Sequence, residues 1–246
     1  MRAHTAILIC IMGAAAFSMG CRNGNGADVI IMGKDINAEK GAQPVMKINT
    51  LVVGFLETNC YIISDENKNA AIIDPGANGD KIIKFIEAKG LNVRVIILTH
   101  THHDHVGALQ AARDRFDVPV IISTEEAAFM GVDRSDMKTY AGKLTGDVFL
   151  AVKQGDEIKV GDITLTVLLT PGHTPGGASY KAGSIVFTGD TLFQDGVGRT
   201  DFQGGNSRQL MESIKQNLLT LPDDTRIYPG HGPSSTIGRE RDYFGS

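Results

Sequence analysis

Residues 98–107 read Leu98-Thr99-His100-Thr101-His102-His103-Asp104-His105-Val106-Gly107. Imidazole and carboxylate groups are the ligands that suit zinc and other divalent metals. Side chains alternate in direction along an extended segment, so His100 and His102 can face one metal ion. Asp104 and His105 lie where the chain turns into a helix, and they can face a second ion. A solvated polar turn is the alternative, but packing gives no reason to gather so many titratable groups. We therefore predict a metal site.

The segments around this run predict an α/β fold. Residues 93–98 form a continuous apolar run, typical of a buried strand, and residues 106–116 favour a helix. Further strands are expected at 46–53, 60–64, 70–74, 118–122, 157–160, 163–169, 184–188 and 226–228. Further helices are expected at 80–90, with Asn78 or Asp80 as the cap, and at 124–130, 207–219 and 236–241. Residues 133–145 are polar and predict a flexible lobe near the site.

Three distant segments each present one more candidate ligand. His173 lies in the loop Thr170-Pro171-Gly172-His173-Thr174-Pro175-Gly176-Gly177, whose prolines and glycines fix the backbone. Asp190 follows an apolar run, and His231 lies in Tyr228-Pro229-Gly230-His231-Gly232-Pro233. Taken alone, a loop histidine is more often a surface residue, and an aspartate after a strand is more often a turn or cap residue.

Together these motifs resemble those of the metallo-β-lactamase-fold hydrolases, from about residue 46 to about residue 241. The resemblance implies an α/β fold of the four-layer αββα sandwich type, with the site at one edge of two sheets. The ligand sets that it implies are His100, His102 and His173 for a first metal and Asp104, His105 and His231 for a second, with Asp190 as a bridge. His103 occupies the variable position of the motif, so we expect it to face solvent or to lie outside the ligand set.

Two divalent metal ions are thus the expected cofactors. Zinc is favoured, with iron or manganese as alternatives, because the same ligands load different metals according to affinity and availability. The expected chemistry is hydrolysis by a metal-bridging hydroxide, formed from water whose pKa has fallen to about 7. Asp104 is a ligand that would also orient this hydroxide. The substrate would be a small molecule with an ester-like bond.

One further segment narrows the branch of the family. Gly196-Val197-Gly198-Arg199-Thr200-Asp201-Phe202 resembles a segment of the small glyoxalase II-like hydrolases, which implies a thiolester substrate of the hydroxyacylglutathione type. The same segment also occurs in the persulfide dioxygenases. Arg199 and Asp201 favour a structural ion pair, and recognition of a substrate carboxylate by Arg199 is the alternative. The β-lactamase members typically carry cysteine or serine near Asp190, so this aspartate argues against that activity. Full-length glyoxalase II enzymes have an extra C-terminal helical region that binds glutathione, and its absence here leaves glutathione itself open.

Two other functions use the same residues. A mononuclear iron dioxygenase acting on a persulfide would use His100, His173 and Asp190 as its two-histidine, one-carboxylate face. A membrane-tethered metal-binding or sensor domain without catalysis is the non-enzyme alternative. Metal content, oxygen uptake and turnover on a panel of esters, thiolesters and lactams would separate the three.

Composition argues against nucleic acid as a partner. The chain has a net charge of −4, with 24 lysines and arginines against 28 aspartates and glutamates, and no basic stripe is present in the sequence. It contains three cysteines, of which only Cys60 lies beyond the N-terminal region. A lone cysteine forms no internal disulfide, so we expect Cys60 to be a small buried hydrophobe.

The first residues predict an exported protein. Residues 1–21 combine a short basic start, an apolar run at 6–17 and a small residue before Cys21, which resembles a bacterial lipoprotein leader. Lipidation of Cys21 would anchor a periplasm-facing protein to the membrane. An ordinary secretory peptide cut nearby, or an uncleaved tail, is the alternative. We expect a tether at 22–44 and the hydrolase domain at 45–246, although the apolar patch at 29–32 could instead form an added strand.

Overall fold

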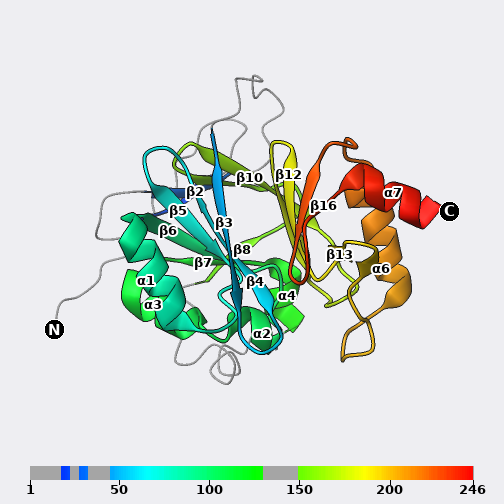
Figure 1. Ribbon diagram of the computed structural model, residues 1–246, viewed down its shortest axis with the longest axis horizontal. Helices are drawn as coiled ribbons and strands as arrows, with labels where there is room; N and C mark the ends of the chain where they lie inside the picture. Colours follow the sequence, from blue (N-terminus) through cyan, green and yellow to red (C-terminus); the bar gives the residue numbers. More distant parts are fainter. Residues whose placement is uncertain (1–17, 23–27, 33–44, 130–148, 246) are drawn as a thin grey trace.

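The computed structural model describes residues 18–22, 28–32, 45–129 and 149–245, and within them two sheets pack face to face (Figure 1). The six-stranded sheet has the order β3 (Lys47–Val53), β4 (Thr58–Ser64), β5 (Asn69–Ile73), β6 (Asn92–Ile97), β7 (Val120–Ser123) and β8 (Phe149–Val152). The eight-stranded sheet has the order β1 (Ser18–Arg22), β2 (Asp28–Met32), β9 (Glu157–Val160), β10 (Ile163–Leu169), β11 (Ala178–Ala182), β12 (Ile185–Gly189), β15 (Arg226–Pro229) and β16 (Ser235–Thr236).

Helices cover the outer face of each sheet (Figure 1). On the six-stranded sheet lie α1 (Gly79–Lys89) and α3 (Leu109–Phe116), which follows the short α2 (His103–Val106). On the eight-stranded sheet lie α6 (Ser207–Ser213), which continues as a π-helical turn at Ile214–Leu218, and α7 (Ile237–Gly245). A short α4 (Thr124–Phe129) follows β7, and β13 (Leu192–Phe193) pairs with β14 (Gly196–Val197) in a small hairpin.

Three apolar cores define four layers. Alternate side chains of a strand point to opposite faces of its sheet, and β4 shows the consequence. Tyr61 and Ile63 join the core between the sheets, whereas Cys60 and Ile62 join the core under α1 and α3. A third core lies between the eight-stranded sheet and the helices α6 and α7. The expected αββα sandwich is confirmed, and Cys60 is fully buried as predicted.

Parallel strands place their carboxyl ends at one edge of the sandwich. β5, β6 and β7 run parallel in one sheet, and β12 and β15 run parallel in the other. The two sheets meet at this edge, because the Asn59 amide donates to the Gly230 carbonyl at 2.7 Å and Thr58 forms a bridge with His231. Ligand sites of α/β folds lie at such carboxyl ends.

The N-terminal prediction is tested only in part. Of the two interpretations of the apolar patch at 29–32, the structure has the added strand, since β2 pairs with β9 as well as with β1. The cleavage point expected before Cys21 falls inside β1. Residues 1–17, 23–27 and 33–44 lie outside the described residues, as does the polar lobe at 133–145. Among the described helices, none is long and apolar enough to cross a membrane.

Six strands and one helix boundary differ from expectation. The strands that were not predicted are all short, at most five residues each: β1, β8, β11, β13, β14 and β16. The helix expected from residue 106 begins at His103 and breaks at Gly107, so Asp104 and His105 lie in the first turn of α2. The break follows from close packing: a Cβ on Gly107 would lie 2.4 Å from the Gly76 carbonyl oxygen. Asn78 does precede α1, but its side chain accepts from the Gly54 amide instead of capping the helix.

Candidate metal centre

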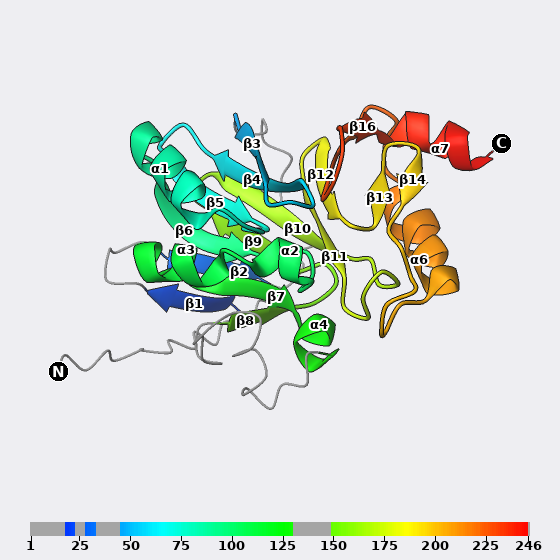
Figure 2. The same cartoon turned by 60° about the horizontal axis from the view of Figure 1, so that its bottom comes forward.

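The seven predicted ligand residues come together at the edge where the sheets meet. Figure 2 shows α2 at this edge, beside the end of the β3–β4 hairpin. Among the described residues, three groups of side chains lie close enough that each could hold an ion: His100, His102 and His173; Asp104, His105 and His231; and Asp74, His100 and His105. The first two groups are the sets that the family resemblance implied. They follow β6, β10 and β15 or begin α2, so separate elements supply each group.

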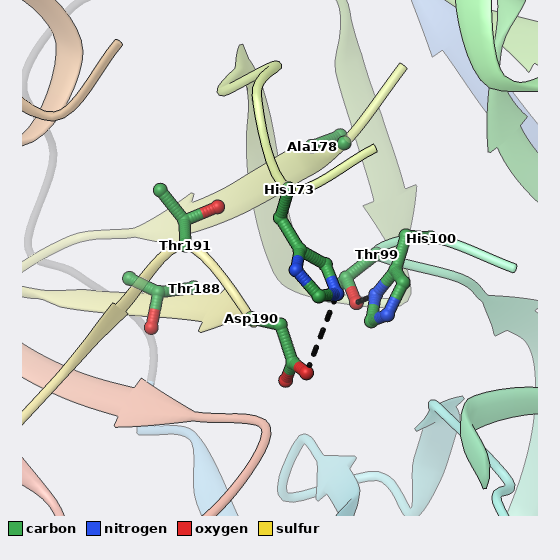
Figure 3. A pocket seen from close by; sticks show the side chains of 8 residues that line it. Thr99, His100, His173, Ala178, Thr188, Asp190 and Thr191 are labelled. Carbon is green, nitrogen blue, oxygen red and sulfur yellow. Dashed lines mark hydrogen bonds and ion pairs between the residues drawn. The ribbon is translucent and has the colours of Figure 1, made fainter. Parts of the chain in front are cut away.

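His100 and His173 of the first group line a small pocket with Asp190. His102 Nδ1 lies 2.9 Å from His173 Nε2, and the His100 ring stands edge-on to both. Figure 3 shows His173 and Asp190 pointing toward each other, with His100 beside them. His100 Nε2 is buried and has no hydrogen-bond partner among the described residues. A buried polar nitrogen without a partner is costly in a folded protein, unless a ligand occupies the space that it faces.

The second group is equally compact. His231 Nε2 lies 3.2 Å from Asp104 Oδ2 and 3.4 Å from His105 Nε2. Asp190 lies between the groups: its carboxylate is 3.5 Å from His173 Nε2, 3.3 Å from His105 Nε2 and 3.6 Å from His231 Nε2. Asp190 Oδ1 is also buried without a hydrogen-bond partner in the described chain. This position is the one that a bridging carboxylate requires.

In two of the histidines, a hydrogen bond from Nδ1 to a backbone carbonyl oxygen determines that Nε2 faces the metal site. His173 Nδ1 donates to the Arg199 carbonyl oxygen at 2.6 Å, and His231 Nδ1 donates to the Leu56 carbonyl oxygen at 2.9 Å. A carbonyl oxygen can only accept, so Nδ1 of each ring carries a proton and Nε2 is the nitrogen left to bind a metal ion. Metal-binding histidines are held in this way. The donor set therefore fits divalent metal ions.

Burial disfavours a charge on His100 and His102. Burial and the neighbouring His105 lower the pKa of His100 well below its usual value. Burial and the facing His173 lower the pKa of His102 to about 4. Neutral imidazole is the form that binds metals.

The second group carries charge in the metal-free protein. Burial opposes a charge on His105, but the Asp190 and Asp74 carboxylates outweigh it and raise the pKa of His105 well above its usual value. Burial is likewise outweighed at His231, where the hydrogen bond with Asp104 raises the pKa. The histidines in turn lower the pKa of Asp104 and of Asp190 against the effect of burial. Metal ions would take the place of these protons.

Two buried carboxylates contact the candidate ligands or their loops. The sequence analysis did not identify either of them. Asp74, directly after β5, lies 2.9 Å from His105 Nδ1 and accepts from the Thr99 amide at 2.8 Å. Glu126, in α4, is fully buried beside the loops of both His102 and His173. The sequence showed Asp74 only as a strand end and Glu126 only as part of a helix start. Nothing in the pattern near either residue marks its distant partners.

Glycines let the loops close on the site. A Cβ on Gly76 would lie 1.8 Å from the Asp104 carbonyl oxygen, and one on Gly198 would lie 1.8 Å from the Asp190 carbonyl oxygen. A Cβ on Gly230 would lie 2.2 Å from Asp190 Oδ1. No side chain fits at these three positions, so the loops reach their present spacing only with glycine.

The remaining predicted residues lie at the rim. Arg199 forms the ion pair that we favoured, with Nε and Nη2 each 2.6 Å from an Asp201 oxygen. Its guanidinium lies 4.1 Å from the Phe202 ring centre, and Phe202 stands edge-on to His102 at 5.3 Å. The His103 side chain is 72% exposed and faces solvent, as expected.

Fold and site together define a metallo-hydrolase of the αββα type. Residues 53–231 match the family model of the metallo-beta-lactamase superfamily, and the chain belongs to that superfamily. It is 39% identical over 207 residues to the probable metallo-hydrolase YqgX of Bacillus subtilis, covering 80% of this chain and 95% of that protein. It is also 39% identical over 202 residues to the hydroxyacylglutathione hydrolase GloC of Haemophilus influenzae, with the same coverage of 80% and 95%.

Solved structures agree with this assignment. The crystal structure of BLEG-1 B3 metallo-beta-lactamase has a TM-score of 0.72 and 35% identity, over 80% of this chain and 97% of that one. ETHE1 from Myxococcus xanthus has a TM-score of 0.68 and 34% identity, over 80% and 82%. TTHA1623, solved in a di-iron-bound form, has a TM-score of 0.66 and 32% identity, over 78% and 96%.

Proposed function

We propose that this protein binds two divalent metal ions, preferably zinc, and hydrolyses a thiolester of the hydroxyacylglutathione type. The observation that carries the metal proposal is the pair of donor groups on either side of Asp190, with unpartnered buried atoms at His100 Nε2 and Asp190 Oδ1. The first ion would be held by His100, His102 and His173, the second by Asp104, His105 and His231, and Asp190 would bridge them.

Charge supports cations in the centre. Asp104 and Asp190 lie among the histidines, and Asp74 contacts His105. Unpaired buried charge is strongly unfavourable, so carboxylates gathered at this place favour bound cations. The two donor groups on either side of Asp190 are what favours two ions over one.

The chemistry then divides between ions and side chains. When bound, such ions polarise a carbonyl group and lower the pKa of bound water to about 7. Asp104 accepts from the Thr58 hydroxyl at 3.2 Å, which fixes the carboxylate beside His105 and His231. A carboxylate held there orients an attacking water toward the substrate carbonyl carbon. No separate serine or cysteine nucleophile is needed.

The thiolester proposal rests on likeness. It is supported by the relative named hydroxyacylglutathione hydrolase, at 39% identity over 95% of its length. The exposed Phe202 ring stands edge-on to His102, and the Arg199 guanidinium lies over that ring. A substrate arm can rest on this ring. Whether the thiol is glutathione is a separate question for the assay.

The experiment is elemental analysis of the purified protein together with an assay of S-lactoylglutathione hydrolysis. About two metal ions per chain with turnover that a chelator removes would support the proposal. Nitrocefin belongs in the substrate panel, because a structural neighbour is described as a B3 metallo-beta-lactamase. Nitrocefin turnover without thiolester turnover would replace the proposed substrate. Tight metal without turnover on any substrate would favour a non-catalytic metal-binding domain.

A second candidate is a mononuclear iron dioxygenase acting on a persulfide. It is favoured by one observation: His100, His173 and Asp190 line the same small pocket and present two histidines and one carboxylate (Figure 3). That ligand set is the face used by non-haem iron oxygenases. One iron per chain, with oxygen consumed in the presence of a persulfide and no thiolester turnover, would establish this alternative.

We also propose that the protein is exported and anchored through Cys21. The support is the composition of residues 1–21. Processing before Cys21 would remove Ser18–Gly20 from β1, so the mature edge strand would be shorter. Mass spectrometry of the N-terminus after expression with the leader tests this proposal. A lipid-modified Cys21 and loss of membrane association in Cys21→Ser are expected, and an intact Met1 would contradict it.

A further inference from the structure

Glu126 joins the two loops that carry the first group of histidines. Its Oε1 accepts from the Thr101 amide at 3.0 Å and from the Thr101 hydroxyl at 2.7 Å. Its Oε2 accepts from the Thr174 hydroxyl at 2.7 Å and from the Gly176 amide at 3.0 Å. Thr101 lies between His100 and His102, and Thr174 follows His173. One side chain therefore holds both loops, with two hydrogen bonds to each.

The carboxylate is completely buried and has no cation beside it in the described parts of the chain. It is a costly group to place in a fold, because buried charges are normally paired. Its four donors satisfy it, and carboxylates that accept several backbone N–H and O–H groups form strong, short hydrogen bonds. A leucine at this position would leave these four donors, two of them backbone N–H groups, without their acceptor.

The start of α4 is shaped to receive the His173 loop. A Cβ on Gly176 would lie 1.8 Å from the Glu126 amide nitrogen, so the loop lies directly on this turn. The Ser123 hydroxyl accepts from the Glu126 amide at 3.0 Å and donates to the Gly176 carbonyl oxygen. The result is the close pair of nitrogens from His102 and His173, 2.9 Å apart.

We infer that Glu126 is a positioning residue for the first metal ion, setting the distance between the His102 and His173 loops. This inference rests on the metal binding proposed above. Asp74 supports the second group through direct contact with His105, whereas Glu126 acts through the loop backbone and two threonines. Asp74 also accepts from the Thr99 hydroxyl, which lies 3.1 Å from His100 Nδ1, so it touches both groups. The Glu126 carboxylate accepts from the two loops of the first group, so its variants address that group.

Glu126→Gln is the sharpest test, because it keeps the shape and removes one acceptor. Each Glu126 oxygen faces a backbone N–H, from Thr101 on one side and Gly176 on the other. A backbone N–H can only donate, so the glutamine NH₂ must meet a donor in either orientation. Glu126→Asp keeps the charge but is one methylene shorter, so it distinguishes the effect of the charge from the effect of side-chain length. Glu125→Gln is the matched control, since Glu125 precedes Glu126 in the same turn and is exposed.

The measurement is zinc binding to the metal-free protein in competition with a chromophoric chelator. Supporting groups around metal ligands change affinity by about 10- to 100-fold. We therefore expect Glu126→Gln to weaken one of two zinc equivalents by that factor and to leave the other unchanged. The absorption spectrum of the cobalt-substituted protein should change at one site. Glu125→Gln should match the wild type in both readouts.

Combination with ligand variants identifies the affected ion. In a His231→Ala background, Glu126→Gln should still weaken the remaining zinc, whereas in a His173→Ala background it should add little. Equal weakening of both equivalents, or a lower melting temperature with both affinities unchanged, would overturn the inference. If Glu126→Gln does not fold, Thr174→Val removes a single donor, and a smaller loss at the same site is expected. Wild-type protein without bound metal would overturn the proposed function itself.

Discussion

Asp74 is expected to control which nitrogen of His105 binds metal. In Asp74→Asn, the side-chain oxygen must stay toward the Thr99 amide, now 2.8 Å from Oδ1, because that N–H can only donate. The new NH₂ then takes the place of Oδ2, which lies 2.9 Å from His105 Nδ1 and 2.6 Å from the Thr99 hydroxyl. Asparagine tolerates the positive φ of 51° at this position, so the backbone can remain as it is.

The consequence is an inverted tautomer. An NH₂ group facing Nδ1 requires Nδ1 to accept, which moves the proton to Nε2, the nitrogen that faces Asp104 and Asp190. To bind metal through Nε2, His105 must then lose the proton from that nitrogen. Loss of such a support typically weakens metal binding by about 10- to 100-fold, which is about 1.4–2.7 kcal/mol.

The assay is the same chelator competition, with Asp80→Asn as the control because Asp80 is an exposed aspartate in the first turn of α1. We expect the second zinc equivalent to weaken more than the first, because Asp74 contacts His105 directly and reaches His100 only through the Thr99 hydroxyl. In the metal-free protein, NMR titration should also show a lower His105 pKa, because one of the two carboxylates that raise it is gone. Wild-type affinity for both ions in Asp74→Asn would refute the tautomer argument.

Three further perturbations test other parts of the centre. Asp190→Ala should leave the fold intact by circular dichroism but reduce turnover by about 100-fold or more, since both ions lose their bridge; full activity would rule out a dinuclear mechanism. Zinc loading should release protons, because neighbouring carboxylates raise the pKa of His105 and of His231 against the effect of burial and so favour their protonated forms when metal is absent. Apparent affinity should therefore increase with pH, and calorimetric heats that do not depend on the buffer would contradict this. Gly230→Ala should lower zinc content, because its Cβ would lie 2.2 Å from Asp190 Oδ1, whereas Gly196→Ala, with its nearest atom at 4.0 Å, should not.

The sequence was sufficient for the parts of the site that local patterns encode. His100, His102, Asp104 and His105 lie in one run, and Pro/Gly loops mark His173 and His231. The αββα arrangement followed from the family resemblance, and the apolar cores confirm it.

What the sequence did not reveal depends on contacts between distant residues. Asp74 meets His105 across 31 positions, and Glu126 meets Gly176 across 50. A buried carboxylate with such partners has the same local pattern as a turn aspartate or a helix cap. The break at Gly107 was missed for the same reason, because it depends on how closely Gly76 approaches in space.

The glycines at Gly76, Gly198 and Gly230 also affect how related sequences should be searched. A search template built only from histidines and aspartates would accept chains that have every donor atom and no room for the loops to close. Adding these three glycine positions makes the template describe the space that the loops need as well as the ligands. A chain with all seven ligands and a larger residue at Gly198 should then be classed as having lost the centre or rebuilt the loop around Asp190.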